Sequence, residues 1–136
     1  MNLTELYAKA DYQDKMGMLF HGDCMNIMND LKFTAERERE RERERVDLTI
    51  TDIPYDSVNR SSNGLRKLDK ENADILTFDL KEFLNNVYEI TNGTIIIFCG
   101  MNQMSEIFNF FDEYAKKGKG TVRQLVWKKT NPSPMN

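Results

Sequence analysis

The residues of this chain best suited to chemistry are Asp52, Ile53, Pro54 and Tyr55, which directly follow an alternation of apolar and polar residues at 46–51. Pro54 has no backbone N–H and restricts Ile53 to extended conformations, so a carboxylate, a carbonyl and an aromatic ring follow the predicted strand. Two acceptors directed at the exocyclic amine of a nucleobase would localise its lone pair for attack on a methyl group, and Tyr55 could stack on a flipped base. The alternative is a turn that ends the strand, with Tyr55 capping the core.

Other common catalytic and metal-binding patterns do not occur in the sequence. There is no Gly-x-Gly-x-x-Gly, no P-loop and no serine in a nucleophile elbow. The single histidine, His21, and the distant cysteines Cys24 and Cys99 do not have the spacing of a zinc site, so no metal is expected. The cysteines are interpreted as small buried hydrophobic residues in a reducing compartment. The candidate chemistry therefore rests on residues 52–55, together with Asp23 after an earlier predicted strand.

Two apolar runs predict the strands that would position these residues. The alternation at residues 46–51 predicts a strand with Val46, Leu48 and Ile50 buried. The continuous apolar run within residues 94–99 is typical of a strand that is buried on both faces of a parallel sheet. Ligands of open α/β sheets bind beyond the carboxyl ends of the strands, which is where Asp52 and its neighbours would lie.

Helical spacing and turn residues predict the remaining elements. Helices are expected at residues 4–15, at residues 25–31, after Asp79, and from Asn102 or Ser105 to residues 116–118, with further strands at residues 17–20 and 121–127. Asn92 and Gly93 are expected to end the helix after Asp79 in a left-handed conformation. The alternation of strands and helices predicts an α/β fold in one domain, residues 1–136, with a mostly parallel sheet and flanking helices.

Two connecting segments differ in composition from the rest of the chain. Residues 36–45 alternate Glu and Arg without an apolar face, so they are interpreted as a low-complexity insertion at the surface, with a charged contact surface as the alternative. Residues 56–74 form a long polar stretch that begins directly after Tyr55. Long loops without secondary structure are usually functional or disordered, and this one is predicted to be an active-site loop.

The bulk composition limits the partners and the location. The chain of 136 residues has a net charge of −3 and 40% hydrophobic residues, which fits a folded domain without the basic surplus of a typical DNA-binding domain. A nucleic-acid partner would need a local basic patch or parts outside this sequence. Residues 1–10 lack a signal-peptide pattern and no apolar run reaches membrane-spanning length, so a cytoplasmic protein without a membrane partner is expected.

The sequence from Asp52 to Tyr55 resembles the (Asp/Asn/Ser)-Pro-Pro-(Tyr/Phe) motif of the S-adenosylmethionine-dependent DNA amino-methyltransferases, which methylate N6 of adenine or N4 of cytosine. The likeness extends beyond the motif. Residues 19–52, with Gly22-Asp23, are similar to the opening of the class in which the catalytic motif precedes the cofactor-binding half. Residues 96–100 and 126–134 are similar to its next strand and to its Trp-x-Lys-x-Asn-Pro segment.

The resemblance implies a partial Rossmann-like methyltransferase fold, S-adenosylmethionine as cofactor and double-stranded DNA with a flipped target base as substrate, of the kind found in restriction-modification systems. Adenine is the expected target, and cytosine N4, an RNA or protein substrate, and a non-catalytic fragment are the alternatives. The implied site residues are Asp52, Ile53, Pro54 and Tyr55 for catalysis, Asp23 and Cys24 for the cofactor, and Trp127, Asn131 and Pro132 near the base.

The sequence departs from the family pattern at two points. Ile53 replaces the first proline of the motif, and we expect this change to be tolerated because the motif uses the carbonyl of that residue. The glycine-rich Phe-x-Gly-x-Gly cofactor loop does not occur. The expectation is therefore a catalytic half, truncated before the cofactor loop or completed by a second polypeptide, that alone binds S-adenosylmethionine weakly or not at all.

Overall fold

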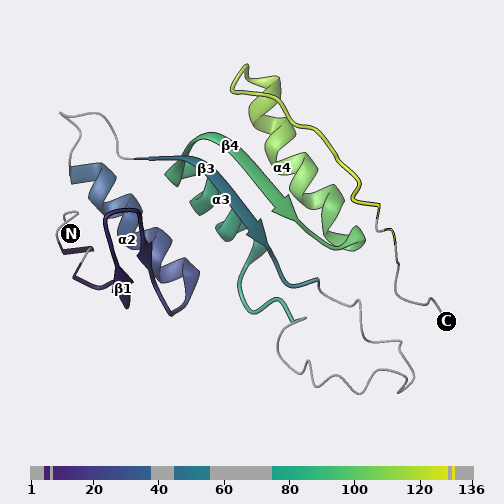
Figure 1. Cartoon of the computed structure of the whole chain (residues 1–136). Helices are drawn as coiled ribbons and strands as arrows, with labels where there is room; N and C mark the ends of the chain where they lie inside the picture. The colour runs from purple at the N-terminus through teal and green to yellow at the C-terminus, as the bar shows by residue number, and fades with distance from the viewer. Residues whose placement is uncertain (1–4, 7, 38–44, 56–74, 129, 131–136) are drawn as a thin grey trace. The chain divides into compact units, whose positions relative to one another are not determined.

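The computed structural model describes residues 5–6, 8–37, 45–55, 75–128 and 130, including the backbone but not the side chains of residues 33–37 (Figure 1). The chain divides into two compact units. Unit 1 contains Met1–Thr51 and Phe78–Ile97, and unit 2 contains Asp52–Thr77 and Phe98–Asn136. The predicted active-site loop at residues 56–74 lies outside the described residues, and so do residues 38–44 of the Glu-Arg run at 36–45.

Unit 1 begins with a short antiparallel hairpin. Strand β1, Tyr12–Gln13, pairs with β2, Met18–Leu19, and the Asp14 carboxylate closes the turn by accepting the backbone N–H groups of Met16 at 2.7 Å and Gly17 at 2.9 Å. The predicted strand at residues 17–20 is confirmed at its centre. The predicted helix at residues 4–15 is wrong across β1, because Asp14 offers the backbone a turn that competes with helical hydrogen bonds.

Two helices of unit 1 pack against each other. Helix α2, Cys24–Arg37, follows Asp23, whose carboxylate accepts the N–H of Met25 at 2.8 Å. Helix α3, Leu80–Ile90, is capped by Asp79 as predicted, with the Asp79 carboxylate accepting the N–H of Glu82 at 2.7 Å. The side chain of Lys32 on α2 joins them, at 2.9 Å from the Asn86 amide oxygen and 2.6 Å from the Glu89 carboxylate. The core formed here contains Met25, Met28, Leu80, Phe83, Leu84 and Val87.

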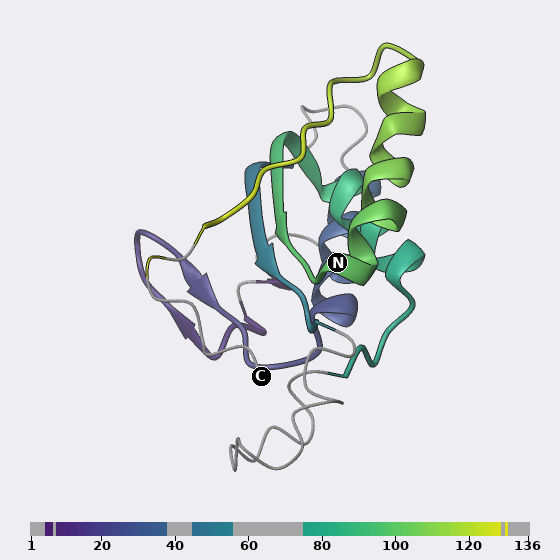
Figure 2. The ribbon, with the colours of Figure 1, turned by 90° about the vertical axis from the view of Figure 1, so that its right-hand side faces the viewer.

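Strands β3, Val46–Asp52, and β4, Thr91–Phe98, form a two-stranded sheet and run parallel, as Figure 1 shows. Figure 2 shows α2 and α3 on one side of this pair. Thr49 faces that side, since its hydroxyl lies 2.6 Å from the hydroxyl of Thr91, which in turn donates to the Val87 carbonyl of α3. Both predicted strands and their parallel direction are confirmed.

The predicted burial of these strands is wrong. The side chains of Leu48 and Ile50 are 50% and 61% exposed, and Ile96 on β4 is 39% exposed. Side chains alternate between the faces of a strand, so helices that cover the Thr49 face leave the apolar face of β3 uncovered by the described residues. The structure shows a small α/β arrangement, and a larger Rossmann-like sheet stays a prediction.

Gly93 does not end α3 in a left-handed conformation. It lies within β4, and the glycines with positive φ among the described residues are Gly118, at 73°, and Gly120, at 102°. Helix α3 instead ends at Ile90, and the next residue, Thr91, has extended backbone angles. Position 93 requires a glycine because the neighbouring strand β3 lies so close that a Cβ would overlap the carbonyl of Asp47.

Unit 2 contains the 3-10 turn η1, Met101–Gln103, and helix α4, Met104–Lys116. The predicted end of α4 is confirmed: Gly118 adopts a φ of 73° and donates its N–H to the Ala115 carbonyl at 2.9 Å. The predicted caps Asn102 and Ser105 are wrong, because the chain enters α4 through η1 and Gln103 occupies the capping position.

The strand predicted at residues 121–127 is also wrong. Residues 119–128 contain no strand, because an extended segment becomes a strand by pairing with a neighbour and none of the described strands pairs with it. Among the described helices, none is both long and apolar enough to cross a membrane.

The burial of two leucines gives a test of this fold. Leu84 is 0% exposed on α3 and Leu48 is 50% exposed on β3. Leu84→Ala is expected to lower the free energy of unfolding by about 2–5 kcal/mol because it leaves a cavity, and Leu48→Ala by less than about 1 kcal/mol. Urea denaturation followed by circular dichroism measures both, and equal losses would contradict the exposed apolar face.

Candidate functional site

The predicted chemical residues lie at the carboxyl end of β3, where the strand leaves the sheet. Asp52 ends β3 and its side chain is exposed, whereas the Ile53 side chain is buried, with 4% exposed. The N–H of Ile53 donates to the Phe98 carbonyl at 3.2 Å. This bond holds the first residue beyond β3 to the last residue of β4, and a proline at position 53 could not form it.

Gln103 holds the next residue of the motif. Its side-chain amide donates from Nε2 to the Pro54 carbonyl oxygen at 2.8 Å and accepts at Oε1 from the N–H of Gly100 at 2.9 Å. The Gln103 residue is buried, with 6% exposed. Both ends of the amide therefore have partners, as a buried polar side chain requires. The interaction fixes the Pro54 carbonyl and not that of Ile53.

Tyr55 lies close to Gly100 and to Asp52. A Cβ on Gly100 would come within 3.3 Å of the Tyr55 Cβ, so the absence of a side chain at position 100 allows this approach. Hydrogen bonding to Asp52, then partial burial and then the negative charges of Asp52 and Cys99, raise the pKa of Tyr55 to about 12. Tyr55 therefore remains a neutral hydrogen-bond donor at physiological pH.

The motif thus brings together the groups that the sequence suggested. A carboxylate, a main-chain carbonyl and an aromatic ring lie within consecutive residues of unit 2 and are held by the chain just after β4. The Asp52 carboxylate that was expected to accept an amine also stabilises the protonated Tyr55 hydroxyl, since Asp52 is the first cause of the raised pKa of Tyr55. Such a site can bind a ligand with N–H donors next to a flat ring.

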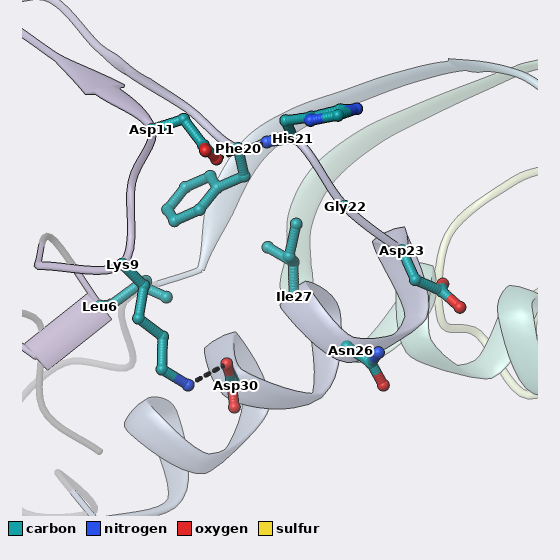
Figure 3. Close-up of a pocket in the computed structure, with 10 residues that line it drawn as sticks. All are labelled: Leu6, Lys9, Asp11, Phe20, His21, Gly22, Asp23, Asn26, Ile27 and Asp30. Carbon is teal, nitrogen blue, oxygen red and sulfur yellow. Dashed lines mark hydrogen bonds and ion pairs between the residues drawn. The ribbon is translucent and has the colours of Figure 1, made fainter.

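Asp23 lies in unit 1 and lines a cavity of about 220 Å³. Figure 3 shows the Lys9–Asp30 ion pair, 2.8 Å long, at one end of the cavity and Asp23 at the other. Asp23 also starts α2 through its bond to Met25, so part of its acceptor capacity serves the helix. The cavity is lined by Leu6, Lys9, Asp11, Phe20, His21, Gly22, Asp23, Asn26, Ile27 and Asp30.

Several of these cavity residues were not predicted as site residues from the sequence. Asp11 was placed inside a helix, but its carboxylate accepts the N–H of His21 at 2.7 Å and supports the loop before α2. Asp11, Asp23 and Asp30 contribute three carboxylates to the lining, whereas Lys9 contributes the one lysine. The hairpin brings Asp11 and His21 together, and a turn signal at Asp14 and Gly17 could have indicated it.

The cysteines have different environments. Cys24, on the first turn of α2, is exposed, so its interpretation as a buried residue is wrong; the start of a helix beside a polar loop leaves the side chain open to water. Partial desolvation and then the negative charge of Asp23 raise the pKa of the Cys24 thiol, which disfavours a nucleophilic thiolate. Cys99 is half-buried, and burial likewise raises its pKa.

The remaining predicted residues are at the end of the chain. Trp127 is 77% exposed, and its ring meets that of Phe98 edge to face, with centroids 6.4 Å apart and planes at 67°. Phe98 is also the residue whose carbonyl holds Ile53, so Trp127 lies near the motif through this shared neighbour. Asn131 and Pro132 lie outside the described residues. Within the described ranges, no group of three or more His, Cys, Asp or Glu residues could hold a metal ion.

Comparisons with known proteins do not assign this chain to a family. No family model, curated protein or solved structure matches it. A functional assignment must therefore come from the residues and their geometry.

Proposed function

We propose that this chain is the catalytic part of a DNA amino-methyltransferase that uses S-adenosylmethionine and acts on the N6 amine of adenine. The observation that carries the proposal is the motif beyond β3, in which the N–H of Ile53 is bonded to Phe98 and the Pro54 carbonyl to Gln103, between Asp52 and Tyr55. The raised pKa of Tyr55, of which Asp52 is the first cause, agrees with this arrangement. The proposal includes a Rossmann-like fold, to which β3, β4, α2 and α3 would belong.

The residues of the motif have separate roles in this proposal. The Asp52 carboxylate and the Ile53 carbonyl accept the N–H groups of the target amine, which concentrates its lone pair on nitrogen. The amine takes the place of the Tyr55 hydroxyl at Asp52, and the released Tyr55 ring stacks on the flipped base. Pro54 keeps Ile53 extended so that its carbonyl points to the same amine.

The side chains that line the cavity around Asp23 are of the kinds that could bind S-adenosylmethionine. Its carboxylates favour a ligand with a positive charge, and Phe20 offers a ring surface to an adenine. A volume of about 220 Å³ is below the roughly 300–1,000 Å³ of complete small-molecule sites, so the cavity would hold a portion of the cofactor. When bound, S-adenosylmethionine supplies the methyl group from its sulfonium. Asp23 accepts the adenine amine, and Cys24 lies in the same turn.

A basic segment after α4 supports a nucleic-acid partner. Lys117, Lys119, Arg123 and Lys128 are exposed, and residues 117–128 contain no acidic residue although the whole chain has a net charge of −3. Lysine and arginine in such a row can contact successive phosphates. Exposed Trp127 in the same segment adds an aromatic surface near Phe98.

A methyl-transfer assay tests the proposal. The purified chain is incubated with methyl-labelled S-adenosylmethionine and unmethylated duplex DNA, alone and with a polypeptide that carries the Phe-x-Gly-x-Gly half of a methyltransferase. We expect N6-methyladenine from the mixture, and little transfer and weak cofactor binding by the chain alone. Mass spectrometry of the digested nucleosides identifies the product.

The outcomes separate the alternatives. N4-methylcytosine would change the target base, and a mixture that labels RNA or protein but not DNA would contradict the DNA substrate. Absence of any transfer with several second halves would favour a non-catalytic fragment. Micromolar binding of S-adenosylmethionine to the chain alone, measured by isothermal titration, would contradict the catalytic-half interpretation.

A further inference from the structure

Gln103 is a buried side chain that connects two parts of unit 2 distant in sequence. It belongs to η1 after β4, yet it bonds the Pro54 carbonyl after β3, at 2.8 Å. Its other contact, from the Gly100 N–H to Oε1 at 2.9 Å, fixes the orientation of the amide, so that Nε2 must face Pro54.

This pair of contacts demands an amide of this length. A glutamate could accept from Gly100, but its ionised carboxylate could not donate to the Pro54 carbonyl and would repel it. A methionine has a similar volume and can make neither bond. An asparagine is shorter by one methylene and cannot span both partners without movement of the backbone.

The bond from Gln103 determines the position of Tyr55 as well as that of Pro54. The residue before Pro54, Ile53, is bonded through its N–H to Phe98, and the residue after it, Tyr55, lies against Gly100. Between them, the Pro54 carbonyl accepts a hydrogen bond from the Gln103 side chain. Its release would allow the peptide between Pro54 and Tyr55 to rotate, and Tyr55 would lose its alignment with Asp52.

We propose that Gln103 is a positioning residue that orients the Asp52 and Tyr55 side chains for methyl transfer, an inference that rests on the function proposed above. Gln103 acts through the Pro54 carbonyl and does not touch the substrate. Its loss should therefore lower kcat more than it raises KM, because the binding surfaces remain while the reacting groups lose their alignment.

The ionisation of Tyr55 reports this alignment without any activity. The full chain is labelled with [ζ-13C]tyrosine, and the Tyr55 signal among the five tyrosines is assigned with Tyr55→Phe. At pH 11 a pKa of about 12 leaves roughly one tenth of Tyr55 ionised, whereas the ordinary value of 10.0 gives roughly nine tenths. Gln103→Met is expected to raise the ionised fraction several-fold, with circular dichroism confirming the fold at this pH.

Gln13→Met provides the matched control, because Gln13 is an exposed glutamine on β1 that belongs to none of the proposed binding or catalytic residues. It should leave both Tyr55 and transfer unchanged, while Gln103→Met lowers kcat about 10- to 100-fold with KM for DNA within about threefold. If the unmutated chain is active and folded Gln103→Met changes neither the ionised fraction of Tyr55 nor kcat, the proposed role of Gln103 is overturned. If Gln103→Met changes the ionised fraction of Tyr55 but the unmutated chain methylates nothing, the proposed function is overturned. Gln103 would then still position residues 54 and 55.

Discussion

Asp52→Ala is expected to lower methyl transfer by about 10²- to 10⁴-fold, the range in which positioned acid–base groups act. The substitution removes the acceptor that draws one N–H of the target amine and leaves the Ile53 carbonyl. The fold should persist, because Asp52 is exposed at the end of β3 and contributes no buried surface. The transfer assay with the complementing half, at saturating DNA, measures the loss in kcat.

Asp47→Ala is the matched control for this experiment. Asp47 is another exposed aspartate on β3, so it tests the loss of a carboxylate from the same strand. Its substitution should leave transfer within about twofold, in line with a surface change of less than about 0.5 kcal/mol. Full activity of Asp52→Ala would contradict the role of Asp52.

The Asp52→Ala variant also tests the interaction between Asp52 and Tyr55 without a measurement of catalysis. The hydrogen bond from Tyr55 to Asp52 is the largest cause of the raised Tyr55 pKa, which is about 12. Asp52→Ala should therefore bring this pKa down toward 10.0, the ordinary value, so that Tyr55 ionises at lower pH. An unchanged pKa would mean that Asp52 and Tyr55 are not partners in solution.

Local sequence signals predicted the end of β3 and the start of α3 correctly. The alternation before Asp52 and the proline after it define where β3 ends, because both effects act within a few residues. Asp79 was recognised as a cap for the same reason, since its carboxylate bonds the N–H of Glu82 within the first turn of α3.

The covered face of the sheet could not be predicted in the same way. A period of two residues shows that Leu48 and Thr49 lie on opposite faces, but not which face meets a helix. In the structure the threonine face receives α3 through Thr91 and Val87, and the apolar face of β3 is exposed. Tertiary packing decided the outcome against the usual preference of apolar residues for burial.

The contacts that fix the candidate site were also beyond local signals. Gln103 and Pro54 are separated by 49 positions, and no pattern in either segment indicates that they meet. The replacement of the first motif proline by Ile53 was expected to be neutral because its carbonyl remains. The structure adds a physical gain, since the Ile53 N–H extends the connection to β4 through Phe98.

Gly93→Ala is expected to lower the free energy of unfolding by about 1–3 kcal/mol or more, the cost of overpacking in a close-packed region. An added Cβ would overlap the Asp47 carbonyl, which belongs to the backbone of β3 and cannot turn away as a side chain could. Relief requires β3 and β4 to separate near Asp47. Against a total stability of roughly 5–15 kcal/mol, such a loss is readily measured by urea denaturation.

A second substitution distinguishes this close approach from the left-handed conformation that the sequence suggested. Asparagine tolerates left-handed backbone angles, so Gly93→Asn would be milder than Gly93→Ala if conformation were the reason for the glycine. If the Asp47 carbonyl is the reason, Gly93→Asn is at least as destabilising, because it adds the same Cβ and more atoms. Asn92→Ala, at the exposed neighbouring position, should change stability by less than about 0.5 kcal/mol. A near-normal Gly93→Asn variant would therefore mean that β3 and β4 do not approach each other at Asp47 and Gly93.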